Sequence, residues 1–154
     1  MRKHFSLLLG LFGLCALLIT APSFAQQCSI TLETDDAMRF SPAEIEVPKN
    51  CEKFTVQLKH VGRLPKLAMG HNWVLVNQSD INGVARTGMA AGLALEYIEP
   101  TDTRVIAHTG LIGAGESTSV TFAVSKLKAG VRYSFLCTFA GHSPIMQGTL
   151  ELAR

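Results

Sequence analysis

Hydrophobic and polar residues alternate along several short stretches of the chain. Phe54, Val56 and Leu58 are separated by single polar residues, and similar alternation runs through 120–124 and 133–137. A period of two places every second side chain on the same face of an extended strand. The pattern therefore predicts half-buried strands at 54–59, 120–124 and 133–137.

Five further stretches have the length and the flanking turn residues of strands. Gly, Pro, Asn or Asp separates several of them, and they cover 29–34, 43–47, 73–76, 104–107 and 148–152. About eight short strands in a chain of this length favour a single two-sheet domain. We expect an all-β fold, an eight-stranded Greek-key β-sandwich.

One segment, 79–92, departs from this strand pattern. Ser79 or Asp80 could cap a helix there, although Gly83 and Gly88 weaken its helical propensity. We expect a short helical flap that lies outside the sandwich.

The first 25 residues have the organisation of a secretory signal peptide. Arg2 and Lys3 precede an apolar run over 7–19, and small residues lie just before the expected cleavage site after Ala25. The apolar run is shorter than the roughly 20 residues that a membrane-spanning helix needs. The predicted organisation is a signal peptide at 1–25 and one domain at 26–154, exported and without stable membrane association.

Removal of the signal peptide leaves a formally neutral chain. The segment carries two cationic side chains and no carboxylate, so 12 Lys and Arg remain against 12 Asp and Glu. Nucleic-acid binding requires a dense basic surface, which a balanced composition does not favour.

Three cysteines remain after residue 25, which is an odd number for an exported protein. Cys28 and Cys51 lie early in the chain and away from the histidines, and an oxidising compartment favours a structural disulfide between them. Cys137 is then available for another role.

Cys137 begins the decapeptide CTFAGHSPIM, which also contains His142 and Met146, and His71 lies in an earlier segment. One thiolate, two imidazoles and one thioether are the ligand set of a blue-copper electron-transfer site. The turn after Cys137 lets one loop supply three ligands, while Gly70, which has no Cβ, lets its carbonyl approach the ion. The pattern predicts one copper ion (Cu⁺/Cu²⁺) and redox transport without catalysis.

These residues resemble the azurins, the bacterial members of the cupredoxin family of type 1 blue-copper proteins. The resemblance covers essentially the whole chain after residue 25. Besides the ligand loop, it rests on MGHNW at 69–73, GMA at 88–90, RVIAHT at 104–109, SVTF at 119–122 and VSKLK at 124–128.

The resemblance implies a definite arrangement of the site. His71, Cys137 and His142 would bind copper in a plane, with Met146 and the Gly70 carbonyl as weak axial ligands, and Cys28 and Cys51 would form a disulfide. The backbone N–H groups of Asn72 and Phe139 would bond the Cys137 sulfur and tune the potential.

The resemblance also implies an apolar docking patch around the edge of His142, through which electrons would leave. The residues of this patch, called the docking patch below, are all apolar: Met38, Leu64, Ala68, Met69, Phe139, Ala140, Pro144 and Ile145. A patch without a charged rim would suit brief contact with several redox proteins. The expected partners are c-type cytochromes and periplasmic reductases or dehydrogenases, met in the periplasm by a monomer.

Other functions fit the sequence less well. A copper oxidase or nitrite reductase needs further histidine-rich centres, but four histidines remain after residue 25 and no His-x-His pair is present. A copper chaperone would want an exposed, exchangeable site, and a metal-free adhesion sandwich leaves Cys137 unexplained. Zinc could occupy the same ligands but would be redox-silent.

Three further residues have more ordinary interpretations. His60, at the end of a predicted strand, fits a titrating histidine near copper and a structural histidine about equally well. His108 is expected at the surface, and Trp73 is expected in the core.

Overall fold

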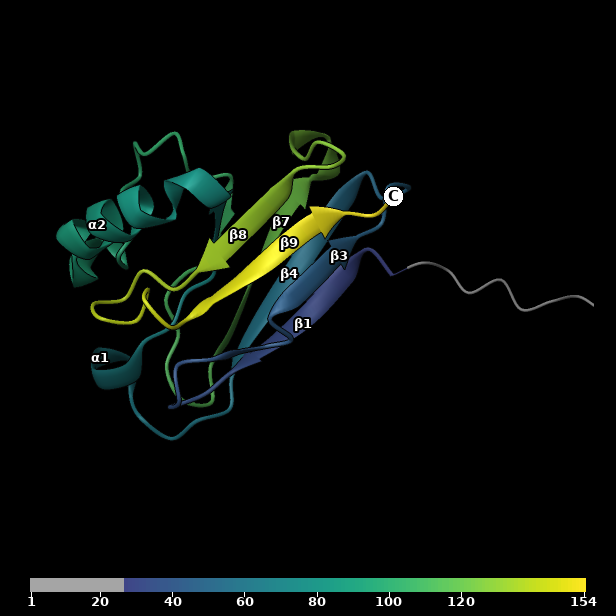
Figure 1. Cartoon of the computed structure of the whole chain (residues 1–154). Coiled ribbons are helices and arrows are strands. Elements are labelled where there is room, and N and C mark those ends of the chain that lie inside the picture. The colour runs from purple at the N-terminus through teal and green to yellow at the C-terminus, as the bar shows by residue number, and fades with distance from the viewer. Residues whose placement is uncertain (1–26) are drawn as a thin grey trace, which may run out of the picture.

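The computed structural model describes residues 27–154, so the predicted signal peptide lies outside the described residues. Two sheets pack face to face (Figure 1). The four-stranded sheet has the order β2 (Phe40–Ser41), β1 (Ser29–Thr34), β4 (Lys53–His60), β7 (Ser117–Ala123). The five-stranded sheet has the order β3 (Glu44–Val47), β9 (Gln147–Leu152), β8 (Arg132–Leu136), β5 (Val74–Asn77), β6 (Ala107–His108).

Both sheets contain parallel and antiparallel pairs. β1 runs parallel to β4 with Ile30 opposite Val56, and β3 runs parallel to β9 with Ile45 opposite Leu150. The other neighbours are antiparallel. The predicted all-β sandwich is confirmed.

The alternating residues form the core between the sheets. Leu32, Val56, Leu58 and Leu150 are fully buried, whereas the intervening polar residues on these strands are mostly exposed. Trp73 is also fully buried and packs between Phe122 and Phe135, with ring centroids 6.3 and 5.6 Å away. The prediction that Trp73 belongs to the core is confirmed.

Two details of the strand prediction were wrong. Nine strands are present in residues 27–154. The ninth, β2, was missed because it contains only two residues and is too short to show alternation. Of the predicted strand 104–107 only Ala107 is in a strand, since Arg104 and Val105 donate their backbone N–H groups to Asp102 and form a turn.

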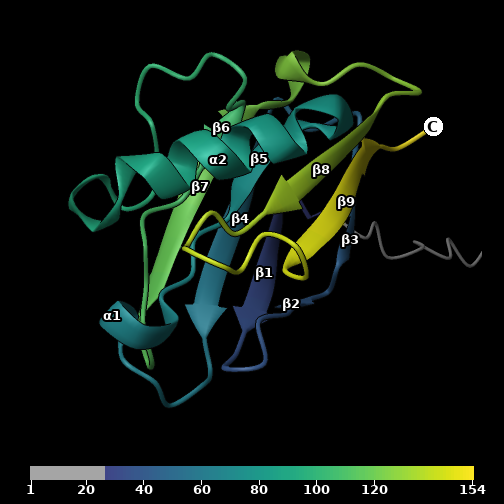
Figure 2. The same ribbon diagram turned by 60° about the vertical axis from the view of Figure 1, so that its left-hand side comes forward.

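The predicted flap is helix α2 (Ile81–Ala91), preceded by a 3-10 turn, η1 (Gln78–Asp80). Asp80 occupies the N-cap position, but its side chain makes no capping hydrogen bond. α2 lies across the outer face of β5 and β8 (Figure 2). A second hydrophobic cluster fills this contact and consists of Val74, Val76, Val84, Ile98 and Leu136.

An ion pair in the segment after α2 is bonded to the helix by a hydroxyl group. The Arg104 guanidinium donates two bonds of 2.7 Å to the carboxylate of Asp102, and the Thr87 hydroxyl of α2 donates a third, also of 2.7 Å. Asp102 is almost buried, with 5% of its side chain exposed. The remaining short helices are α1 (Lys66–Met69), η2 (Leu93–Leu95) and η3 (Val124–Lys126).

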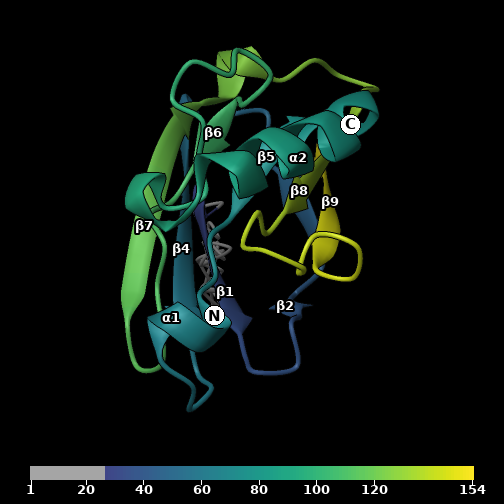
Figure 3. The ribbon, with the colours of Figure 1, turned by 90° about the vertical axis from the view of Figure 1, so that its left-hand side faces the viewer.

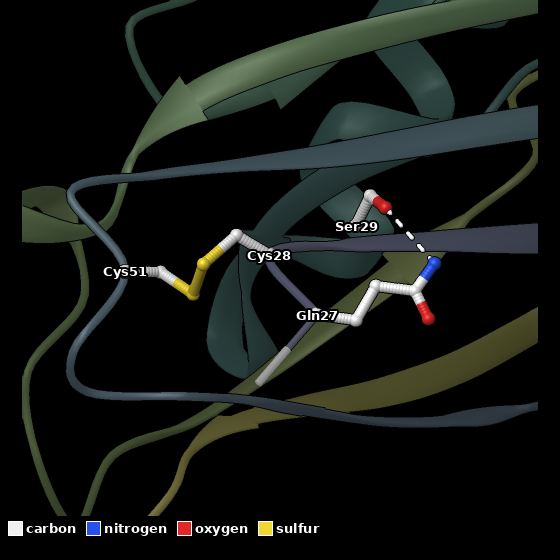
Figure 4. Close-up of a disulfide and its surroundings, with 4 residues drawn as sticks. All are labelled: Gln27, Cys28, Ser29 and Cys51. Carbon is white, nitrogen blue, oxygen red and sulfur yellow. Dashed lines mark hydrogen bonds between the residues drawn. A yellow bond between two sulfur atoms is a disulfide. The ribbon is translucent and has the colours of Figure 1, made fainter. Parts of the chain in front are cut away.

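Cys28 and Cys51 form a disulfide, as expected (Figure 4). It joins the residue before β1 to the turn that precedes β4, at the end of the sandwich opposite His60. Across residues 27–154, no helix has the length and apolar character needed to cross a membrane.

Candidate metal centre

Three predicted ligands, His71, Cys137 and His142, meet at one end of the sandwich. Their ligand atoms all lie within 4.8 Å of one another, and all three residues are buried. Cys137 directly follows β8, and His142 lies in the loop between β8 and β9. Figure 3 shows this loop between α1 and α2.

His71 comes from a separate segment that is fixed to the sandwich by its backbone. Its N–H and C=O bond Ile112 at 2.9 Å each, forming an isolated bridge just before β5. The Cys137 sulfur lies 3.9 Å from Nδ1 of His71 and 3.6 Å from Nδ1 of His142. Both imidazoles therefore present Nδ1 to the same side of the thiol, as ligands of one ion would.

Burial sets the protonation of these groups. Desolvation lowers the pKa of His71 to about 4, helped by the neighbouring His142 and His60, and also lowers the pKa of His142. Both imidazoles are thus neutral at pH 7, the form that binds a metal. Desolvation raises the pKa of the Cys137 thiol to about 12.

Two backbone N–H groups face the sulfur of Cys137. Those of Asn72 and Phe139 favour the thiolate and partly oppose the effect of burial. They are the two groups that the resemblance assigned to this role. In a buried site, such donors supply the stabilisation that water cannot.

The orientation of His71 is set by groups around its ring. Nε2–H donates a hydrogen bond of 3.0 Å to the Asp35 carbonyl, which leaves Nδ1 with a lone pair for a metal. His60 stacks on the ring with centroids 4.8 Å apart. His60 itself accepts the Gly62 N–H at Nδ1 and donates from Nε2 to the Met69 carbonyl.

Both axial candidates contact Cys137, Gly70 through its carbonyl and Met146 through its backbone. Gly70 places its carbonyl oxygen 3.9 Å from the Cys137 sulfur. A Cβ at residue 70 would lie 2.6 Å from the Lys66 carbonyl, so a larger residue would move the backbone. Met146 is fully buried, and its carbonyl accepts the Cys137 N–H at 3.1 Å, which brings the two ends of the loop together.

The donor set suits copper. A thiolate favours Cu(I), imidazole accepts both oxidation states, and a buried thioether adds a soft donor. No other group of His, Cys, Asp and Glu within residues 27–154 brings three possible ligand atoms together in this way.

Residues of the predicted docking patch differ in their exposure. Ile145 is 63% and Leu64 41% exposed, whereas Phe139 is buried and its ring contacts that of His142 in a tilted arrangement, with centroids 4.6 Å apart. His142 is 4% exposed. His108, predicted at the surface, is exposed and lies on β6, away from the ligands.

Several contributing residues were missed from the sequence. Asp35 orients His71 through its backbone, and Thr138 bonds Asn72 through both its backbone and its side chain. Leu67 and Met89 are strongly exposed beside the docking patch. Only Thr138 carried a signal, its position next to Cys137, because the other contacts depend on loop geometry.

Comparisons with known proteins agree with this site. A family model described as copper-binding proteins of the plastocyanin/azurin family matches residues 26–153. Azurin of Pseudomonas aeruginosa is 55% identical over 135 residues, which are 88% of this chain and 91% of that protein. Azurin of Achromobacter denitrificans is 55% identical over 132 residues, 86% of this chain and 89% of that protein.

A solved structure has the same fold. Azurin from the obligate methylotroph Methylomonas sp. strain J superimposes with a TM-score of 0.80 at 43% sequence identity. The match covers 84% of this chain and all of that one.

Proposed function

We infer the function from the family to which this chain belongs, the plastocyanin/azurin family of copper-binding proteins. The azurins and other cupredoxins of this family are electron-transfer proteins and not enzymes. We propose that this protein carries single electrons between redox proteins of the periplasm. The observation that carries the proposal is the meeting of one thiol and two imidazoles within 4.8 Å in a buried site. Copper bound there supplies the Cu(I)/Cu(II) couple.

The proposed ligands are His71, Cys137 and His142, with Met146 and the Gly70 carbonyl as weaker axial donors. His71 is held by the backbone of Ile112 and by Asp35, and Cys137 by its bond to Met146. These contacts keep the ligand positions nearly the same in both oxidation states. A site that does not rearrange keeps the reorganisation energy of electron transfer low.

Electrons are proposed to enter and leave through His142. Its ring contacts the Phe139 ring, and its centroid lies 5.0 Å from that of the His71 ring. The apolar residues around it exclude water from a contact surface without demanding a permanent complex. We therefore propose short-lived complexes with c-type cytochromes and with periplasmic reductases or dehydrogenases, formed by a monomer.

The periplasmic location rests on the sequence of residues 1–25 and on the disulfide, which persists in an oxidising compartment. N-terminal sequencing of the protein purified from its host should begin at Gln26. A mature protein that retains the first 25 residues would contradict cleavage.

The main test is the visible absorption spectrum of the metal-free protein after addition of Cu(II). An intense band near the red end, from charge transfer between the Cys137 thiolate and copper, is expected. The Cys137→Ser variant should fold and lack the band. A folded, thiol-intact protein without the band would reject the proposed function.

A further inference from the structure

The docking patch is larger and less neutral than the sequence suggested. Leu67 on α1 is 73% exposed and adjoins Ala68 of the patch. Met89 on α2 is 51% exposed and shares a shallow groove of about 70 Å³ with Phe139. Exposed apolar side chains are therefore present on α1 and α2, the two helices on either side of the ligand loop (Figure 3 shows the helices and the loop).

Two arginines lie at the edges of this surface. Arg86 projects from α2 and lines the same groove as Met89, Gly141 and Ser143. Arg63 precedes Leu64 in the loop before α1. Both arginines are exposed, and within residues 27–154 neither side chain has an ion pair or hydrogen bond. The expectation of a patch without a charged rim was therefore wrong.

Within residues 27–154, the nearby carboxylates form no ion pair with either arginine. Asp35 pairs with Arg39 at 3.2 Å, and Glu116 pairs with Lys66 at 3.1 Å. Asp36 accepts the backbone N–H groups of Arg63 and Leu64. The Asp36 carboxylate thus lies beside the backbone of Arg63, whereas no carboxylate lines the groove at Arg86.

We propose that this face selects a redox protein whose own docking surface carries carboxylates beside an apolar contact. Arg86 pairs with one carboxylate at the groove between α2 and the ligand loop, and Arg63 pairs with another on the far side of the patch. The apolar residues supply the contact, while the arginines steer the encounter and fix which way round the partner binds. The inference rests on the proposed electron transfer and names the chemistry of its partner.

The test measures electron transfer from the reduced, copper-loaded protein to two oxidised c-type cytochromes by stopped flow. One cytochrome has carboxylates around its haem edge, and the other has lysines. Arg63→Gln and Arg86→Gln should each lower the second-order rate constant with the acidic cytochrome about threefold at low salt, as expected for one exposed ion pair. The double variant should also lose most of its salt dependence, and its rate with the basic cytochrome should rise.

Lys53→Gln is the matched control, because it removes the same charge from an exposed residue at the disulfide end of β4. It should change neither rate by a comparable factor. Arginine variants that behave like this control would overturn the inference. A second outcome would also overturn it. If the double variant lost binding to anionic phospholipid vesicles but kept both cytochrome rates, the arginines would be assigned to a membrane surface.

Failure of the proposed function gives a different result. A wild-type protein that forms no blue site, or passes electrons to neither cytochrome, rejects electron transfer itself. Equal transfer to both cytochromes with the same salt dependence leaves electron transfer intact and rejects only the selectivity.

Discussion

Asn72 and Thr138 tie together the two segments that supply the copper ligands. The Asn72 side-chain oxygen accepts the Thr138 N–H at 2.9 Å, and its amide nitrogen lies 2.8 Å from the Thr138 hydroxyl. The Thr138 hydroxyl also donates to the Tyr97 carbonyl at 2.7 Å. Each of these two residues immediately follows a proposed ligand, so the contact fixes the separation of His71 and Cys137.

Replacing Asn72 should weaken both the fold and the site. Asn72→Leu leaves the buried Thr138 N–H without an acceptor, and we expect a loss of about 2–3 kcal/mol in the free energy of unfolding. The charge-transfer band should also shift, because the sulfur is no longer held in place. Urea unfolding of the metal-free protein and the spectrum of the copper form measure the two effects.

Asn77→Ala is the control for this experiment, since within residues 27–154 the Asn77 side chain makes only an exposed hydrogen bond, to Asp80. It should lower stability slightly and leave the spectrum unchanged. If Asn72→Leu matched it in both measurements, the proposed link between the segments would be wrong.

Gly88 is expected to resist substitution although it lies within a helix. Alanine favours a helix by about 1 kcal/mol over glycine. A Cβ at residue 88 would, however, lie 2.5 Å from the Tyr97 carbonyl oxygen and 2.8 Å from Cβ of Thr138. We expect Gly88→Ala to lower stability by about 1–3 kcal/mol and to shift the visible band.

Gly83 on the same helix provides the comparison. The added methyl would meet the end of the Arg104 side chain, which can move, and it would not touch the ligand loop. Gly83→Ala should therefore cost less stability and leave the band in place. A stabilising Gly88→Ala with an unchanged spectrum would show that α2 tolerates a wider separation from Thr138.

Metal binding at pH 7 should release about one proton. The Cys137 thiol has a pKa of about 12 and is protonated without metal, whereas His71, with a pKa of about 4, is already neutral. Affinity should therefore rise about tenfold per pH unit above neutrality. Calorimetry with Zn²⁺, which avoids oxidation of the thiol, in two buffers of different ionisation enthalpy measures the number released.

Cys137→Ser should bind zinc more weakly and release no proton. Release close to zero from the wild-type protein would mean that the Asn72 and Phe139 N–H groups stabilise the thiolate more strongly than burial destabilises it.

Asp102 should give the protein an acid-sensitive contribution to stability. The Arg104 guanidinium, followed by the Thr87 hydroxyl, holds the pKa of this carboxyl well below its usual value of 3.8. A lowered folded-state pKa stabilises the protein fully above the unfolded value, and this contribution is lost as the pH falls below about 4 towards the folded value. Asp102→Asn should cost about 2 kcal/mol at pH 7, with the difference from wild type narrowing below pH 4.

Chemical unfolding at several pH values follows this difference. Glu52→Gln, at an exposed residue, should show no comparable loss at pH 7. A constant gap between Asp102→Asn and wild type from pH 7 to below pH 4 would contradict the role of the ionised carboxylate.

The parts of the structure that repeat with a period of two were predictable from the sequence. Phe54, Val56 and Leu58 identified β4 because each contributes to one buried face. The turn at Asp102 and Arg104 was not predictable, because it depends on the Asp102 carboxylate, which accepts both the backbone N–H and the guanidinium of Arg104. β2 was missed because its pairing depends on β1 and not on its own two residues.

The candidate site divides in the same way. The types and spacing of Cys137, His142 and Met146 identified the ligand loop, because few functions require that donor set. The contribution of Asp35 was invisible, since any residue type has a carbonyl to offer to His71. The charged rim was missed because the sequence does not show which arginines have an ionic partner. The fold places a carboxylate beside Arg39 but none in an ion pair with Arg86.

The position of β9 determines when the copper site can form during folding. β9 lies between β3 and β8, so it joins residues 44–47 to the strand that carries Cys137. Until residues 147–152 are available, β3 and β8 both expose unpaired edges, and the ligand loop has no strand at its far end. The pairing of β3 with β9, in which Glu44 lies opposite Thr149, is among the longest-range contacts in residues 27–154, and such contacts form slowly. Copper acquisition is therefore a property of the finished sheet, and a nascent chain that already contains His71, Cys137 and His142 has the ligands but not the site.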